Sequence, residues 1–241
     1  MESKTYSIYR VEDSVDRIDE ILNTGLFTDS SVIPSRDKLT FVNGYYVNVI
    51  ALFIDIVGSS EMTDSSRRPT LAKIYRSFIS ECTAILDSDV NCKEINIHGD
   101  CVWGVFDKRH PFDIDNVFEK AGQLSSLVDI LNYKLCKKGY PEISVGIGID
   151  YGRALMVKAG YKGSGLNDVI WMGDVVNGAS HLSNTAGRNG YSRVIISDVV
   201  YRNLKDDYKK LVAETVVNGN KCYHGYIVNI GMDEWLKKNS K

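Results

Sequence analysis

Along the chain, the spacing of apolar residues switches repeatedly between two periods, and each switch predicts a new element. Helices are predicted where apolar residues recur every three or four positions, over residues 70–87, 115–138 and 173–187. Strands are predicted at short apolar runs rich in β-branched residues, over residues 45–55, 92–97, 101–106, 143–152, 169–172 and 194–197. Because helices and strands alternate while some strands follow each other through tight turns, we expect an α/β (α+β) fold with a mixed central sheet flanked by helices.

The two ends of the chain follow different patterns. Residues 11–23 place four apolar side chains on one helical face and are followed by a polar, turn-rich stretch. We therefore expect residues 1–40 to form a helical N-terminal extension with a linker, and residues 41–241 to form one domain. The segments 211–217 and 221–230 are predicted to close that domain with a hairpin.

The most apolar of these strands contains an aspartate. In FIDIVGSS, residues 53–60, Asp55 lies between two isoleucines and the small turn Gly58-Ser59-Ser60 follows. A carboxylate in a buried strand is costly unless it is paired or binds a metal ion. The amides of a tight turn at a helix start can bind an anion. The segment therefore indicates either a metal ligand beside a phosphate cradle, or a capping aspartate before an ordinary loop.

A second aspartate favours the metal interpretation. Asp100 lies in the short turn between residues 92–97 and 101–106, which are therefore predicted to form a hairpin. If this hairpin pairs beside the strand that holds Asp55, the two carboxylates meet at one end of the sheet. Close carboxylates repel each other unless a cation neutralises them. Oxygen ligands without histidine or cysteine favour Mg²⁺ or Mn²⁺ over zinc.

Composition excludes several classes of protein. The formal net charge is −2, which argues against a nucleic-acid-binding coat or a basic membrane-binding patch. No apolar run reaches the length of a membrane span, and the N-terminus lacks the apolar core of a signal peptide. The five cysteines include no C-x-x-C pair and are typical of reduced thiols. We therefore expect a cytoplasmic protein that binds neither nucleic acid nor membrane.

Three segments resemble the motifs of one enzyme family. FIDIVGSS resembles the F-x-D-I-x-G-F-T/S motif of the class III nucleotidyl cyclases, the adenylate and guanylate cyclase catalytic domain. INIHGDCVWGVF resembles the second motif of that family, in which Gly-Asp opens a strand. VIWMGDVVNGASHLSNTAG resembles the third, a G-x-x-x-N-x-A-x-R helix. The motifs occur in order across roughly residues 45–230, and they imply a ferredoxin-like palm of the class III cyclase type.

The resemblance implies a metal-dependent cyclisation. Two Mn²⁺ or Mg²⁺ ions would bind to Asp55, Asp100 and the carbonyl of Ile56. The ribose 3′-hydroxyl of a nucleoside triphosphate would attack the α-phosphate in line, and pyrophosphate would leave. Asn177 resembles the residue that orients the ribose, and Lys221 resembles a lysine that contacts phosphate. The implied nucleotide contacts in the first motif are Phe53, Val57, Gly58, Ser59 and Ser60.

The chain departs from the purine cyclases at the positions that read the base and at the transition-state arginine. Asn96 replaces the lysine or glutamate of the purine enzymes, and Ile170 replaces their second base reader. An asparagine offers both a donor and an acceptor, so it suits a base edge that carries one of each. His181 stands where the family has its transition-state arginine. Three arginines are candidates to replace it, and the sequence does not rank them: Arg153, Arg188 and Arg193.

Within the class III cyclases, the sequence most resembles the bacterial Pycsar pyrimidine cyclases. The segments that carry it are NGYYVN, RRPTLAKIYR and EINIHGDCVWGVF. That family implies UTP or CTP as substrate, with UTP preferred here, and a cyclic nucleotide that a separate effector senses in antiphage defence. It also implies a homodimer with sites at the interface. The alternatives are an adenylate cyclase with atypical base readers and a nucleotide-binding signalling module without catalysis.

Overall fold

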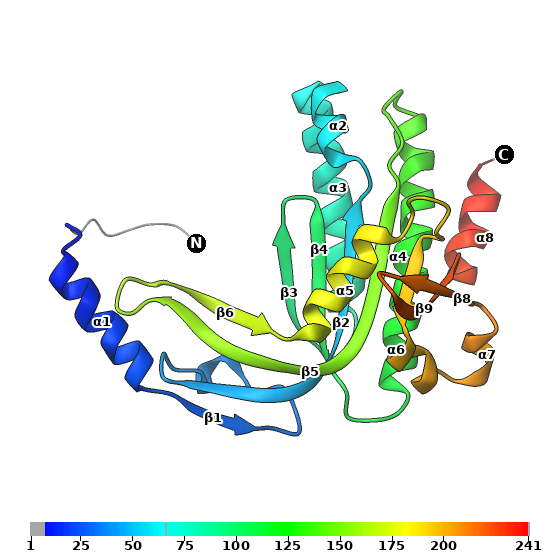
Figure 1. Ribbon diagram of the computed structural model, residues 1–241. Coiled ribbons are helices and arrows are strands. Elements are labelled where there is room, and N and C mark those ends of the chain that lie inside the picture. Colours follow the sequence, from blue (N-terminus) through cyan, green and yellow to red (C-terminus); the bar gives the residue numbers. More distant parts are fainter. Residues whose placement is uncertain (1–7, 66, 241) are drawn as a thin grey trace. The chain divides into compact units, whose positions relative to one another are not determined.

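The structure is a computed structural model that describes residues 8–65 and 67–240 (Figure 1). The chain forms two compact units. The small unit comprises the chain up to Asn48 together with Arg153–Asp174, and the large unit comprises Val49–Gly152 and the chain from Val175 onwards. Two long strands, β2 (Asn43–Ile56) and β5 (Val145–Tyr161), run from one unit into the other. Residues 1–7 of the expected N-terminal extension lie outside the described residues.

The large unit is built on a mixed sheet, as the alternating pattern predicts. Its strand order is β3-β4-β2-β5-β7-β9-β8. The β5–β7 pair is parallel, whereas β2–β4, β3–β4, β7–β9 and β8–β9 are antiparallel. The strands besides β2 and β5 are β3 (Cys92–His98), β4 (Cys101–Asp107), β7 (Val194–Ser197), β8 (Ala213–Val217) and β9 (Asn220–Gly225). The predicted hairpin of residues 92–97 and 101–106 is therefore confirmed, and so is its place beside β2.

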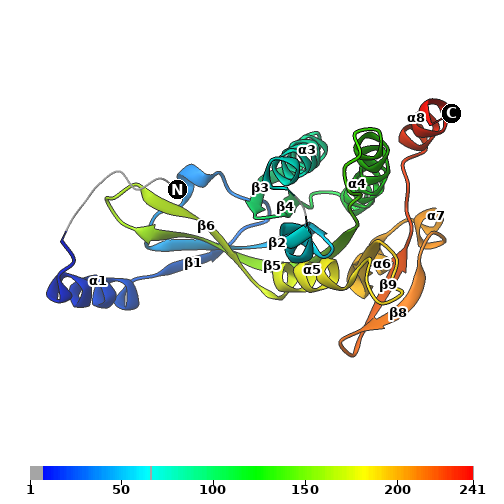
Figure 2. The same ribbon diagram turned by 90° about the horizontal axis from the view of Figure 1, so that it is seen from above.

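Helices cover both faces of this sheet. Helices α3 (Arg68–Asp87) and α4 (Asp113–Cys136) lie on one face and α5 (Asp174–Thr185) lies on the other (Figure 2). The main core lies between the sheet and the α3–α4 pair, and includes Ile54, Phe78, Phe106 and Phe118. Shorter helices complete the unit: α2 (Ser59–Ser65), α6 (Asp198–Asn203), α7 (Asp206–Lys209) and α8 (Ile230–Asn239).

Two glycines in β5 determine how closely α5 approaches the sheet. Successive strand residues point to opposite faces, so Ile147 faces the main core while Gly146 and Gly148 face α5. A Cβ atom on Gly148 would lie 2.2 Å from the Ala179 carbonyl oxygen, and one on Gly146 would lie 2.0 Å from that of Ser183. The backbone of α5 therefore rests directly on the backbone of β5. This contact fixes the helix that carries the third sequence motif.

The small unit contains the first part of β2, the second part of β5, and four further elements. These are α1 (Val11–Asn23), β1 (Leu26–Asp29), a 3₁₀ turn (Arg36–Lys38) and β6 (Leu166–Met172). Strand β1 pairs in parallel with β2, and β6 pairs in antiparallel fashion with β5. The helix expected over residues 11–23 is present, but none of its side chains is buried. The stretch expected to be a linker includes β1, and the domain boundary at residue 40 stays a prediction.

The C-terminal region differs from expectation in one respect. The predicted closing hairpin is present as β8 and β9, but the chain continues into α8, which the apolar pattern did not predict. The side chain of Asn229 accepts a hydrogen bond from the Met232 amide and caps this helix. In the described part of the chain, no helix combines the length and apolarity needed to cross a membrane.

Candidate active site

The two aspartates singled out by sequence meet at one end of the sheet. In the β2–β4 pair, Ile54 lies opposite Val102, so Asp55 and Asp100 both lie just beyond the last paired residues. Burial and the nearby charge of Asp100 raise the pKa of the Asp55 carboxyl above its ordinary value. Burial, with the charges of both aspartates adding to it, also raises the pKa of the neighbouring Cys101 thiol to about 12. The arrangement therefore concentrates negative charge in a partly buried place.

This arrangement fits a hard divalent cation. The Oδ2 atom of Asp100 is buried and has no hydrogen-bond partner, and a buried carboxylate oxygen normally has one. No group of three or more His, Cys, Asp or Glu side chains is positioned to hold a metal ion among the described residues. The protein ligands at hand are therefore two carboxylates and backbone oxygens. Mg²⁺ is usually bound by one or two carboxylates together with substrate phosphates.

Of the three arginines that sequence left unranked, only Arg188 reaches the aspartates. Its Nη2 atom lies 3.3 Å from Asp55 Oδ2 and 3.5 Å from the Ile56 carbonyl oxygen. Arg193 instead donates to the Ser125 carbonyl and to Asp129, and Arg153, in the small unit, pairs with Asp29. The guanidinium of Arg188 partly offsets the rise in the pKa of Asp55. Its position after Gly187 in the T-A-G-R stretch was the available signal, since the end of a helix needs donors for its last carbonyls.

The turn after Asp55 has the backbone form that the cradle interpretation requires, with one exception. Gly58 has a φ of +71°, a left-handed conformation that favours glycine, and α2 begins at Ser59. The Val57 amide, expected to face the nucleotide, donates to the Ser144 carbonyl at 2.8 Å, and its contact with a nucleotide stays a prediction. The turn that remains for an anion comprises Gly58, Ser59 and Ser60.

A tyrosine that sequence reasoning missed supports this turn. The Tyr75 hydroxyl is hydrogen-bonded to Ser59, and burial and the charge of Asp100 raise its pKa. Tyr75 belongs to α3 and directly follows Ile74, a core residue. The only indication in the sequence is that Tyr75, an aromatic residue with a polar hydroxyl, directly follows an apolar residue of the predicted helix. Tyr75 connects α3 to the turn and to the carboxylates.

The base-reading position lies on the neighbouring hairpin. Asn96 is on β3, directly opposite Trp103 of β4. Its Nδ2 atom is buried and has no hydrogen-bond partner. Phe53, expected beside the nucleotide, is instead buried against Trp103, with ring centroids 4.8 Å apart. The Trp103 indole N–H donates to His98 Nδ1 at 3.4 Å, so His98 acts as a local hydrogen-bond partner.

The third motif and Lys221 contribute side chains to a separate cavity of the large unit. Asn177 and His181 are exposed and one turn apart on α5. His181 and Lys221 line a cavity of about 300 Å³ together with Asp150 and Asp198; neither Asp55 nor Asp100 is among the described residues that line it. Helix rise of about 1.5 Å per residue places Asn177 roughly 12 Å from the end of α5, where Arg188 follows. Within one chain, the structure thus brings Arg188, rather than Asn177, to the aspartates.

Lys221 has an ion-pair partner in the structure. Its Nζ atom lies 2.7 Å from Glu214 Oε2 across the β8–β9 hairpin. Hydrogen bonds to Glu214 and Tyr223 raise the pKa of Lys221, so the amine is a cation at neutral pH. Its cavity neighbour His181 is exposed, and so is Lys221 itself. Both side chains are open to a ligand that approaches this face.

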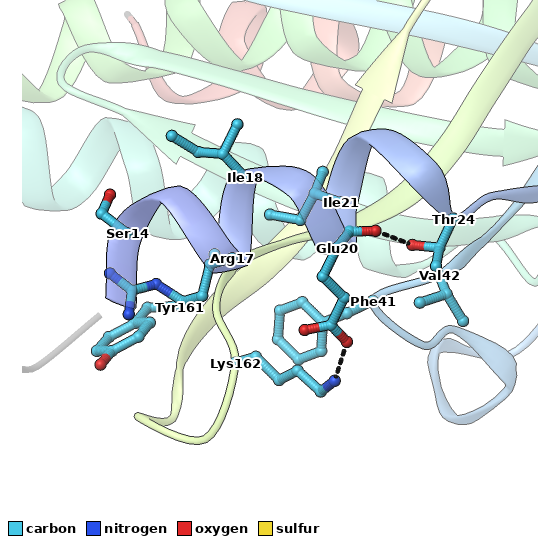
Figure 3. Close-up of a pocket in the computed structure, with 11 residues that line it drawn as sticks. Ser14, Arg17, Ile18, Glu20, Ile21, Thr24, Phe41, Val42, Tyr161 and Lys162 are labelled. Carbon is cyan, nitrogen blue, oxygen red and sulfur yellow. Dashed lines mark hydrogen bonds and ion pairs between the residues drawn. The ribbon is translucent and has the colours of Figure 1, made fainter. Parts of the chain in front are cut away.

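A second cavity, in the small unit, has different chemistry. It measures about 300 Å³ and is lined by α1, Phe41, Val42 and the β5–β6 turn (Figure 3). Its one lining carboxylate, Glu20, lies 2.7 Å from Lys162 Nζ. The Arg17 guanidinium lies over the Tyr161 ring. The described lining residues of this cavity include no pair of carboxylates.

The chain is similar to known proteins over most of its length. Residues 42–230 match the family described as the adenylate and guanylate cyclase catalytic domain. A uridylate cyclase from Treponema porcinum is 35% identical over 233 residues, which covers 95% of this chain and 82% of the relative. A uridylate cyclase from Gulbenkiania mobilis is 37% identical over 254 residues, with 98% of each chain covered.

A solved structure extends the likeness to the fold. The crystal structure of the adenylyl cyclase CyaB from P. aeruginosa matches with a TM-score of 0.64 at 18% identity, and the match covers 75% of this chain and 94% of that one. At that identity the likeness shows a shared fold, with a mixed sheet flanked by helices. Since the family model spans most of the chain and two relatives exceed 30% identity, this chain belongs to the class III nucleotidyl cyclases, the family of the adenylate and guanylate cyclase catalytic domain.

Proposed function

We propose that this protein is a pyrimidine nucleotidyl cyclase that converts UTP, or CTP, to the 3′,5′-cyclic nucleotide and pyrophosphate. The observation that carries the proposal is the facing pair Asp55 and Asp100, with a buried carboxylate oxygen that lacks a partner. The likeness to two uridylate cyclases supports the choice of a pyrimidine, with UTP preferred.

In this proposal the aspartates and the turn hold the reacting groups. Asp55, Asp100 and the Ile56 carbonyl bind two Mn²⁺ or Mg²⁺ ions. When bound, such ions lower the pKa of the attacking hydroxyl and stabilise charge on the phosphoryl oxygens. The turn of Gly58, Ser59 and Ser60 holds the triphosphate, and the Tyr75 hydroxyl keeps Ser59 in place. Most of the rate enhancement then comes from positioning and electrostatics.

The other half of the site comes from a second copy of the chain. His181 and Lys221 line a cavity that has neither aspartate among its described lining residues, and Asn177 lies one turn before His181 on α5. A closed two-fold homodimer would bring this surface of one chain to the aspartates of the other and form two equivalent sites. In that dimer Asn177 orients the ribose, while His181 and Lys221 donate to the phosphates.

The biological role follows from the resemblance to the Pycsar cyclases. We propose that the cyclic nucleotide is a second messenger made in the cytoplasm during antiphage defence, and that a separate effector protein senses it. The Pycsar-like segments of residues 43–48, 67–76 and 94–106 support this role.

One assay tests the reaction and the substrate class together. The purified protein is incubated with ATP, GTP, CTP or UTP in the presence of Mn²⁺, and products are identified by mass spectrometry. We expect cyclic UMP as the main product, with equimolar pyrophosphate. Cyclic AMP alone would contradict the pyrimidine assignment, and NTP binding without pyrophosphate release would contradict the cyclase assignment.

Asn96 is expected to read the base. Its buried, unpartnered Nδ2 is a donor that suits the O4 carbonyl of uracil, whereas cytosine presents an amino group there. In the Asn96→Asp variant the side chain only accepts hydrogen bonds. We expect the ratio of kcat/KM for UTP to that for CTP to fall by about tenfold or more, because an unpaired buried polar group strongly disfavours a ligand.

The control for Asn96→Asp is Asn203→Asp, the same change at an exposed position on α6. Steady-state rates with both triphosphates are measured for wild type and each variant. An unchanged UTP-to-CTP ratio in Asn96→Asp would show that another residue reads the base.

A further inference from the structure

We propose that Arg188 is an internal counter-ion of Asp55 that lies against two of the expected metal ligands, and that a divalent cation must displace it. The inference rests on the proposed function and deepens it, since it concerns how the Asp55 site is held before an ion arrives. Arg188 acts through Asp55 and is therefore a positioning residue.

The first observation is that Arg188 contacts two of the expected metal ligands. Its Nη2 atom lies 3.3 Å from Asp55 Oδ2 and 3.5 Å from the Ile56 carbonyl oxygen. The Arg188 side chain is 25% exposed and that of Asp55 is 18% exposed, so solvent screens their attraction only in part. A guanidinium at this position repels a second cation on the same oxygens. Arg188 and a metal ion therefore compete for one place.

The second observation is that the other end of the guanidinium is anchored. Arg188 Nη1 donates to the Ser183 carbonyl at 3.1 Å and to the Ala186 carbonyl at 3.2 Å, the last turn of the α5 region. Gly187 has a φ of +69°, and a Cβ atom there would lie 2.5 Å from the Val145 carbonyl oxygen. The backbone before Arg188 is thus held against β5. Displacement from Asp55 would free Nη2 while Nη1 remains anchored at α5.

These contacts connect metal occupancy to the helix that carries Asn177 and His181. One planar group, the Arg188 guanidinium, joins the Asp55 carboxylate to the Ser183 carbonyl in the last turn of α5. An ion at Asp55 removes one side of that connection. The site therefore has two arrangements, one closed by Arg188 and one open to the cation.

The test measures Mn²⁺ binding without nucleotide, so catalysis does not enter the readout. Free Mn²⁺ is followed by electron paramagnetic resonance for wild type, Arg188→Gln and Arg188→Met. The glutamine of Arg188→Gln keeps N–H donors for the α5 carbonyls but carries no charge. This variant therefore still tests the proposal if Arg188→Met does not fold. We expect both variants to bind Mn²⁺ about tenfold more tightly than wild type, because a competing cation has been removed.

Two controls separate this proposal from the proposed function. Arg202→Met removes a surface arginine that pairs with Asp198 on α6, and its Mn²⁺ affinity should equal that of wild type. Asp55→Asn should abolish the binding. Folded Arg188→Gln protein that binds Mn²⁺ no more tightly than wild type overturns the counter-ion proposal alone. Absence of saturable binding in wild type and in both Arg188 variants likewise overturns the counter-ion proposal, whereas the proposed function is tested separately by cyclic UMP formation in the presence of UTP and Mn²⁺.

Discussion

Replacing Asp55 by asparagine is expected to reduce cyclase activity by about a thousandfold or more. The amide keeps the shape of the side chain but lacks the charge that binds a divalent cation. Asp100 Oδ2 then remains as an isolated carboxylate oxygen in a buried place. The measurement is cyclic UMP formation at saturating UTP and Mn²⁺. Asp207→Asn, whose side chain is 81% exposed on α7, is the matched control and should retain full activity. Activity near wild type in Asp55→Asn would contradict the two-metal site.

The same variant should be more stable than wild type when metal is absent. The pKa of Asp55 is raised by burial and by Asp100, even though Arg188 attracts it. A carboxyl with a higher pKa in the folded chain lowers the free energy of unfolding as pH rises above its ordinary value of about 4. We expect the melting temperature of Asp55→Asn to exceed that of wild type by about 2 °C at pH 8. The difference should disappear near pH 3, where Asp55 is protonated in both folded and unfolded wild type. Excess Mn²⁺ should reverse the order at pH 8.

Mixing two inactive variants is expected to restore activity if the site is shared between subunits. Asp55→Asn damages the metal half, and Asn177→Ala damages the half carried by α5. In a mixed dimer one site has both defects and the other has neither. Random pairing of equal amounts places about a quarter of all sites in the intact arrangement. Co-expressed chains carrying different tags should therefore recover about a quarter of wild-type activity.

The control for this experiment pairs two defects in the same half. Asp55→Asn mixed with Asp100→Asn leaves every site with a damaged metal half, so no recovery is expected. Recovery in the Asp55→Asn and Asn177→Ala mixture that does not exceed the sum of the two variants alone would contradict the shared site. A single chain would then have to bring Asn177 to its own aspartates.

The fold of the large unit was largely predictable because its elements have strong local signals. The short turn between β3 and β4 requires these two strands to pair with each other. The long apolar run of β2 predicts a strand in the interior of a sheet. Once that hairpin pairs beside β2, the meeting of Asp55 and Asp100 follows from register alone. The Gly58 turn was predictable for the same reason, since its residue type and place after a strand are local features.

What sequence did not predict depends on contacts between distant residues. Arg188 reaches Asp55 across 133 positions of the chain. Its place after Gly187 indicates a donor for the end of a helix, but it does not indicate a contact with Asp55. Strand β1 has four residues, too few for a periodic pattern, and its place is set by pairing with β2. Helix α8 contacts α4 through Trp235, whose ring lies against that of Tyr133, a contact between distant parts of the chain. Asn96 was found by its place in a motif, but its unpaired donor is visible only once β3 is folded.

The glycine pair in β5 has a consequence for how the family can diversify. Because α5 rests on the sheet through main-chain atoms at Gly146 and Gly148, its position does not depend on which side chains it carries outward. Exposed residues such as Asn177 and His181 can therefore change without moving the helix. In a scaffold of this kind, the main chain sets the position of the helix, and the outward side chains set the chemistry of its exposed surface. One architecture can then accept different side chains at positions such as that of His181, and evolution or a protein engineer can vary that surface one residue at a time.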